Sequence, residues 1–176
     1  MKNRFPTLTQ IIPVLSILCV LFYGWTAVMF LWKLSSWLFF LTFGEIAVLA
    51  AYASVTNLVE SLVLLGILLL AAALLPARWL KDDFSLRGGA LAITLAGSML
   101  LINHLSVIDR LGPVAYWPLW ILGALLFGMA LSSIASRVTI VGRAIVWLGD
   151  QFSVFLFILL PMSVVSIVVL LARMLF

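Results

Sequence analysis

Charged side chains are scarce in this sequence. Of its 176 residues, 9% are Asp, Glu, Lys or Arg, whereas a soluble globular domain carries about 25%. Hydrophobic residues make up 66%, and the mean hydropathy is +1.33. A folded domain of this size still exposes much of its surface, so this composition excludes a water-soluble protein. It predicts an integral membrane protein.

Cysteine and histidine are also scarce, with Cys19 and His104 the sole examples. A disulfide framework needs paired cysteines, and a metal or haem site needs several ligands at fitting spacings. We therefore expect no metal and no other cofactor. Hydrolase motifs, glycine-rich phosphate loops and paired acid and base residues are missing, so we expect no enzyme.

The basic residues are few and scattered. Ten Lys and Arg against six Asp and Glu leave a net charge of +4. This modest excess excludes a nucleic-acid partner and indicates contact with membrane lipid headgroups. In short loops, basic residues also favour the cytoplasmic side, and their distribution weakly favours both termini facing away from the cytoplasm.

Long apolar runs dominate the chain. A helix crosses a bilayer in about 20 residues, so this length holds six crossings with short turns. We predict an all-α bundle forming a single transmembrane domain over residues 1–176, with one interfacial amphipathic segment. The expected transmembrane helices are 11–32, 37–55, 58–75, 89–107, 116–136 and 151–172.

Polar residues suggest where these helices begin and end. Lys33 to Ser36 is expected to form a tight turn. Asn57 and Glu60 have the spacing of a capping pair, so we expect them to open the third helix. The segment from Arg137 to Gly149 is predicted to lie in the interface, because polar residues recur there on one helical side. The residues that share this side are Ser132, Ser136, Thr139, Arg143 and Asp150.

Several stretches in the first half of the chain can be compared with known sequences. They are Lys33-Leu34-Ser35-Ser36-Trp37-Leu38-Phe39-Phe40, Gly44-Glu45, Leu58-Val59-Glu60-Ser61-Leu62 and Leu75-Pro76-Ala77-Arg78-Trp79-Leu80-Lys81-Asp82-Asp83-Phe84. Together they resemble an uncharacterised family of small polytopic bacterial inner-membrane proteins. The resemblance implies a bacterial cytoplasmic membrane and supplies no activity, cofactor or catalytic residue.

Glu45 is the sharpest candidate for a site. It lies about eight residues inside the expected second helix, where an ionised carboxylate costs several kcal/mol unless it is paired or protonated. Tyr23 and Thr26 on the first helix are expected to donate hydrogen bonds to it. Two interpretations remain open: a proton or cation site, or a carboxylic acid that pairs helices within the bundle or against a partner subunit. The second is favoured.

Small residues recur at helical spacing in two segments. Such stripes let helix backbones approach closely, which drives association in lipid. The neighbouring helices could belong to this chain or to another. The stripes are Gly44, Ala47, Ala51 and Ser54, and Ala124, Gly128, Ser132 and Ser136. A further set is expected to contact lipid headgroups or the interface: Arg78, Trp79, Lys81, Arg87, His104, Trp117 and Arg143.

Two functions follow from these features. The first is a non-catalytic integral membrane subunit that packs against other transmembrane subunits of a larger complex, for instance an energy-transducing electron-transfer complex. It rests on the small-residue faces and on the shortage of ionisable groups inside the predicted spans. The alternative is a small transporter or channel that uses Glu45, with Pro161 and the region around Asp150 interrupting its helices.

Overall fold

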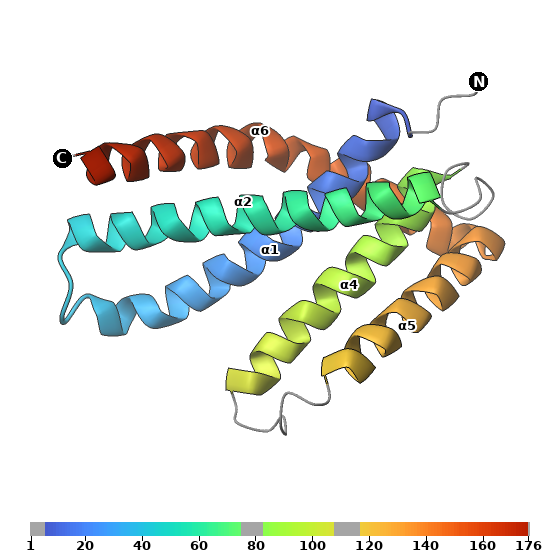
Figure 1. The fold of residues 1–176 in the computed structure, drawn as a ribbon, viewed down its shortest axis with the longest axis horizontal. Helices are drawn as coiled ribbons and strands as arrows, with labels where there is room; N and C mark the ends of the chain where they lie inside the picture. Colours follow the sequence, from blue (N-terminus) through green and yellow to red (C-terminus); the bar gives the residue numbers. More distant parts are fainter. Residues whose placement is uncertain (1–5, 75–82, 108–116, 176) are drawn as a thin grey trace.

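The computed structural model describes residues 6–74, 83–107 and 117–175. Over these ranges the fold is all-α, with five helices rather than the six expected. They are α1 (Leu8–Trp37), α2 (Phe43–Leu74), α4 (Phe84–Val107), α5 (Trp117–Arg137) and α6 (Thr139–Leu175) (Figure 1). Each is long and apolar enough to cross a membrane, so the chain is a polytopic membrane protein.

The expected second and third helices are one continuous helix, α2. Asn57 and Glu60 lie in its interior and open no new helix. The Thr56 hydroxyl donates to the Tyr52 carbonyl at 3.0 Å, and the Ser61 hydroxyl donates to the Asn57 carbonyl at 2.7 Å. Because these hydroxyls bond to the preceding turn of their own helix, the polar cluster does not interrupt it.

The first connection also differs from the expectation. Helix α1 continues through Lys33 to Trp37, and the chain turns over residues 38–42 instead. At its other end, Thr7 caps α1, with its backbone N–H donating to Gln10 Oε1 at 3.3 Å. This capping box satisfies two backbone donors that would otherwise lack partners at the helix start.

The expected interfacial segment is the first part of α6 and packs against other helices. Val138 alone separates α5 from α6. A Cβ added to Gly142 would lie 2.8 Å from the Ala135 carbonyl oxygen, which shows how closely the two helices meet there. Ile145, one turn on, is buried beside Ala90. With 37 residues, α6 is about 56 Å long and extends beyond a hydrocarbon core of about 30 Å.

The helices form two groups that meet at one end of the molecule. Helix α1 packs against α2, α4 and α6, while α4 packs most extensively against α5. In Figure 1 the α4–α5 pair meets the others where α2 ends, and diverges from them toward its own connection. The main core lies where α1, α2 and α4 converge and includes Val14, Leu18, Phe22, Leu65, Leu68, Phe84 and Leu91.

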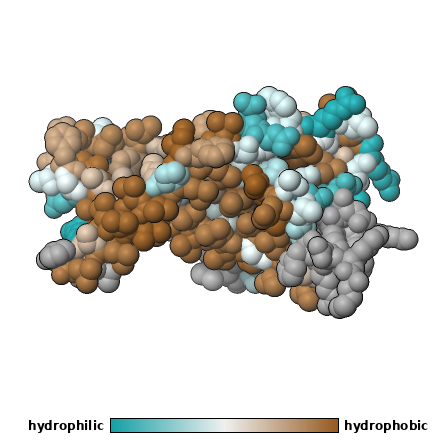
Figure 2. Space-filling model, turned by 90° about the horizontal axis from the view of Figure 1, so that it is seen from above, coloured by the Kyte–Doolittle hydropathy of each residue, from teal (hydrophilic) through white to brown (hydrophobic). Residues whose placement is uncertain are grey.

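The outer surface suits a lipid environment. Figure 2 shows apolar atoms across the middle of one face and hydrophilic atoms gathered toward one end of the long axis. Arg137 and Arg143, on either side of the α5–α6 junction, are exposed. Helix α1 begins toward one end of the long axis, and α6 ends at the other (Figure 1). Five candidate spans, an odd number, replace the six that were expected to place both termini on one side.

Candidate functional site

A polar stripe on α1 holds three helices together. Ser16, Cys19, Tyr23 and Thr26 recur at intervals of three and four residues and so share one face of α1. The Ser16 hydroxyl donates to the Gly149 carbonyl of α6 at 2.8 Å. The Tyr23 hydroxyl donates to the Ser54 carbonyl of α2 at 2.8 Å and also hydrogen-bonds the Ser163 hydroxyl of α6. In lipid, such interhelical bonds stabilise the bundle.

Glu45 lies elsewhere and does not meet Tyr23 or Thr26 as expected. Because α2 begins at Phe43, Glu45 is in its first turn rather than deep in a span. Its carboxylate accepts hydrogen bonds from the Thr42 backbone N–H at 2.8 Å and from the Thr42 hydroxyl at 2.9 Å. Glu45 is exposed and acts as the capping carboxylate of α2.

Glu60 is an acidic residue far from both ends of a membrane-spanning helix, and its side chain is exposed. It is 17 residues from the first residue of α2 and 14 from the last, or about 26 Å and 21 Å along the helix. It lines a groove of about 780 Å³ between α1, α2, α4 and α5. Trp25, Thr26, Asn57 and Ser98 also line this groove, and the rest of its wall is mostly apolar.

The polar groups of this groove are incompletely paired. Within the described ranges, the Glu60 carboxylate has no hydrogen bond and no ion pair. Asn57 is 5% exposed, and its side-chain carbonyl accepts a hydrogen bond from the Thr26 hydroxyl at 2.9 Å. No described group accepts from its amide N–H₂. An acceptor and a donor without a described partner therefore lie almost one turn apart along the wall of the groove.

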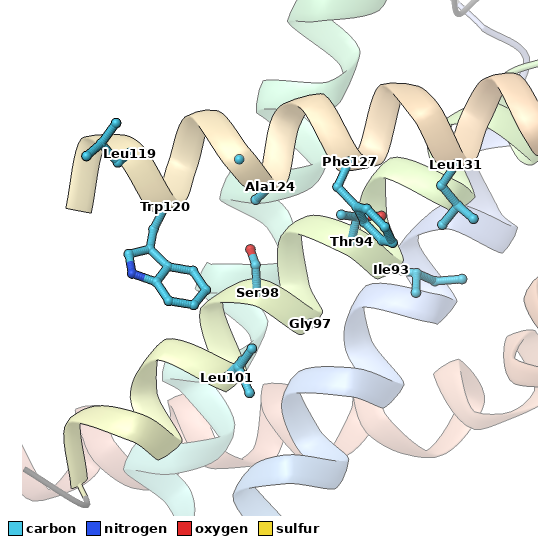
Figure 3. Close-up of a pocket in the computed structure, with 11 residues that line it drawn as sticks. Ile93, Thr94, Gly97, Ser98, Leu101, Leu119, Trp120, Ala124, Phe127 and Leu131 are labelled. Atoms are coloured by element: carbon cyan, nitrogen blue, oxygen red, sulfur yellow. The ribbon is translucent and has the colours of Figure 1, made fainter. Parts of the chain in front are cut away.

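A second hollow, of about 620 Å³, lies between α4 and α5 (Figure 3). The Trp120 side chain extends from α5 toward α4, close to Ser98. The Thr94 hydroxyl donates to Ala90 and the Ser98 hydroxyl to Leu95, both at 2.8 Å and within α4. Since these hydroxyls are satisfied by their own helix, this hollow suits apolar contents such as lipid acyl chains. Ser98 lines both hollows.

The small-residue stripes are divided between inward and outward positions. On α5, Gly128 is buried, and a Cβ there would lie 2.8 Å from Leu91 Cδ2 of α4. The neighbour of this stripe is thus a helix of the same chain. Ser132 is buried as well, Ala124 is half-buried, and Ser136 is exposed. On α2, Ala51 and Ser54 are buried while Gly44 and Ala47 are exposed.

The residues expected at the interface are only partly described. Arg87 lies half-buried in the first turn of α4, and Arg143 is exposed on α6. Arg78, Trp79 and Lys81 lie outside the described residues, as do the side chains of His104 and Trp117. Asp150 is exposed on α6 and lines neither hollow. Across the described ranges, no three His, Cys, Asp or Glu side chains gather as a metal ion requires.

Sequence reasoning assigned Glu60 to a cap and missed the groove. One signal was available: Ala53, Asn57, Glu60, Leu64 and Ile67 recur every three or four residues, which places Glu60 on one face of an uninterrupted helix. The walls from α1, α4 and α5 come from distant parts of the sequence, and no spacing reveals them. Comparisons with protein-family models, curated proteins and solved structures give no match.

Proposed function

We propose that the protein is a non-catalytic integral membrane subunit that packs laterally against a larger membrane protein assembly. The observation that carries this proposal is the groove between the α1–α2 and α4–α5 pairs, with its unpaired carboxylate at membrane depth. The isolated chain leaves Glu60 unsatisfied among its described residues. A partner that enters the groove removes this cost.

The shape of the groove along α2 favours a helix as its occupant. Its α2 wall extends from Ala53 to Ile67, a length of about 21 Å or four helical turns. The wall residues recur at the three- and four-residue intervals with which one helix receives another. Helices α2 and α4 touch only sparingly, so much of this face of α2 is uncovered by the described helices.

The setting of the proposed subunit is a bacterial cytoplasmic membrane, as the resemblance of the first half of the chain implies. An energy-transducing electron-transfer complex is the class of assembly we propose. We also propose an orientation. With five crossings, the turns on the N-terminal side hold more basic residues of the sequence than those on the opposite side, which favours an N-terminus in the cytoplasm.

A small transporter is the second candidate, and Glu60 is the observation that favours it. An ionisable group inside a span commonly marks a substrate or ion pathway. For a transporter, the proposed ionisable site residue is Glu60 rather than Glu45, because Glu45 caps the start of α2 outside the groove. Against a transporter, the described lining of the groove holds one carboxylate, and the hydroxyls of Tyr23, Thr94 and Ser98 are engaged in hydrogen bonds.

Photo-crosslinking in native membranes tests the proposed function. A photoreactive amino acid replaces Met99, which lines the groove, and a matched one replaces Phe157, which is exposed on α6 and lines neither hollow. We expect one protein adduct of constant mass at position 99 and lipid adducts alone at position 157. The crosslinked protein should also copurify in fixed ratio with the unmodified chain in mild detergent.

Lipid adducts alone at both positions would contradict a partner in the groove. The transporter predicts a different result from the same purified material. In that case the chain purifies alone, moves a solute into liposomes, and loses this activity on Glu60→Gln but not on Glu45→Gln.

A further inference from the structure

We propose that the groove receives a transmembrane helix whose Lys or Arg side chain pairs with Glu60 near the middle of the bilayer. This inference rests on the proposed function and names the chemistry of the partner. It follows from the depth of Glu60, from the lack of a described basic residue in the groove, and from the length of the groove along α2.

The depth of Glu60 favours a partner of opposite charge. The carboxylate lies near the centre of a 32-residue apolar helix, far from either end. Charged side chains at this depth are costly unless they pair with another group. Lys33, Arg87, Arg137, Arg143 and Arg173 are the basic residues of the described ranges, and none of them lines the groove. No described basic residue supplies a cation to Glu60, so in this proposal the occupant supplies it.

The surroundings of Glu60 suit a basic side chain. Asn57 lies almost one turn away and keeps an amide donor directed to no described partner. Its N–H₂ group can bond a backbone or side-chain oxygen of the occupant beside the charge pair. Phe22 and Trp25 also line the groove, and the face of an aromatic ring attracts a cation.

The extent of the groove favours a helix over a small organic cation. A small cation would need only the turn of α2 that holds Asn57 and Glu60. The wall continues for about two further turns, through Leu64 to Ile67, and is apolar there. An apolar helix with one basic residue matches both the polar and the apolar stretch of this wall. The basic side chain pairs with Glu60, and the apolar side chains of the same helix cover Leu64 and Ile67.

The test uses the purified full chain in lipid nanodiscs and synthetic dansyl-labelled peptides. The host peptide is an Ala/Leu helix of about 21 residues, which is long enough to cross the bilayer. Its central residue is Lys, Leu or Glu. Binding is read from energy transfer between the tryptophans of the protein and the dansyl group. We expect the Lys peptide to bind about tenfold more tightly than the Leu peptide, as for a polar helix–helix contact in lipid.

The same Glu→Gln substitution at positions 60 and 45 shows whether the preference for the Lys peptide arises in the groove. Glu60→Gln should abolish the preference for Lys, whereas Glu45→Gln should leave it unchanged, because Glu45 caps the start of α2. Glu60→Lys should reverse the preference in favour of the Glu peptide. Circular dichroism melting verifies that each variant folds. If Glu60→Gln fails to fold, the reversed preference of Glu60→Lys tests the charge pair instead. Met99→Trp fills the groove and should therefore weaken the binding of every peptide.

The outcomes separate this inference from the proposed function. Equal binding of the Lys and Leu peptides would overturn the charge pair and leave the groove as a helix site. If no peptide binds, the helix occupant is wrong. Binding of tetraphenylphosphonium that depends on Glu60, with no binding of any peptide, would overturn both proposals in favour of a small-cation site.

Discussion

Alkaline phosphatase fused after Thr42 or after Phe176 is expected to be active, and the same enzyme fused after Val138 is expected to be inactive. This enzyme folds and acts only outside the cytoplasm, so its activity reports which side a fusion point occupies. Thr42 follows one crossing, Val138 follows four and Phe176 follows five. Activity measured in whole cells, corrected for the amount of fusion protein, gives the result.

The expected side follows from the distribution of basic residues. With five crossings, one side holds the chain before α1, the α2–α4 connection and the α5–α6 junction with the adjacent helix ends. That side carries Lys2, Arg4, Arg78, Lys81, Arg87, Arg137 and Arg143, and the other carries Lys33, Arg110 and Arg173. Basic residues tend to be retained in the cytoplasm, so we expect Thr42 and Phe176 to face outward. Opposite results at Thr42 and Phe176 would contradict five crossings.

Gly149→Ala should reduce the free energy of unfolding by about 2 kcal/mol, the typical cost of overpacking a close contact. A Cβ at position 149 would lie 2.7 Å from Pro13 Cβ and 3.3 Å from the Pro13 carbonyl oxygen. The proline ring cannot rotate away, so α6 must shift from α1. That shift also strains the 2.8 Å hydrogen bond from Ser16 to the Gly149 carbonyl.

Gly66→Ala is the matched control for this substitution. Nothing lies within 4 Å of a Cβ at Gly66, in the interior of α2. Alanine is favoured over glycine in a helix by about 1 kcal/mol, so this variant should be as stable as the parent or more so. Thermal unfolding in detergent, followed by circular dichroism, measures both. Equal melting temperatures for the two variants would show that α1 and α6 do not approach each other at Gly149.

Composition was enough to predict the lipid environment and the helical fold, because 66% hydrophobic residues leave few other solutions. The number of helices was wrong for a local reason. Thr56, Asn57 and Glu60 together look like the start of a helix, but hydroxyl groups such as that of Thr56 can bond to their own helix. Sequence spacing does not distinguish these two uses of the same residues.

The candidate site was less predictable than the fold. Glu45 was chosen because the second helix was expected to begin at residue 37, and a start at Phe43 moves the carboxylate into the first turn. Glu60 was assigned to a cap, and its true position depends on α2 being continuous. The groove around it combines four helices that are distant in sequence. Such a grouping depends on tertiary packing, which no single helix pattern contains.

Chemical modification by dicyclohexylcarbodiimide tests most directly whether Glu60 is the carboxyl group inside the membrane. This apolar reagent partitions into lipid and attacks carboxyl groups that it reaches from there. Mass spectrometry of the purified chain, treated in lipid nanodiscs without a partner, should find the adduct on Glu60, in the groove, and not on Glu45, which Thr42 holds at the start of α2. Modification of Glu45 with Glu60 left intact would contradict the placement of both residues.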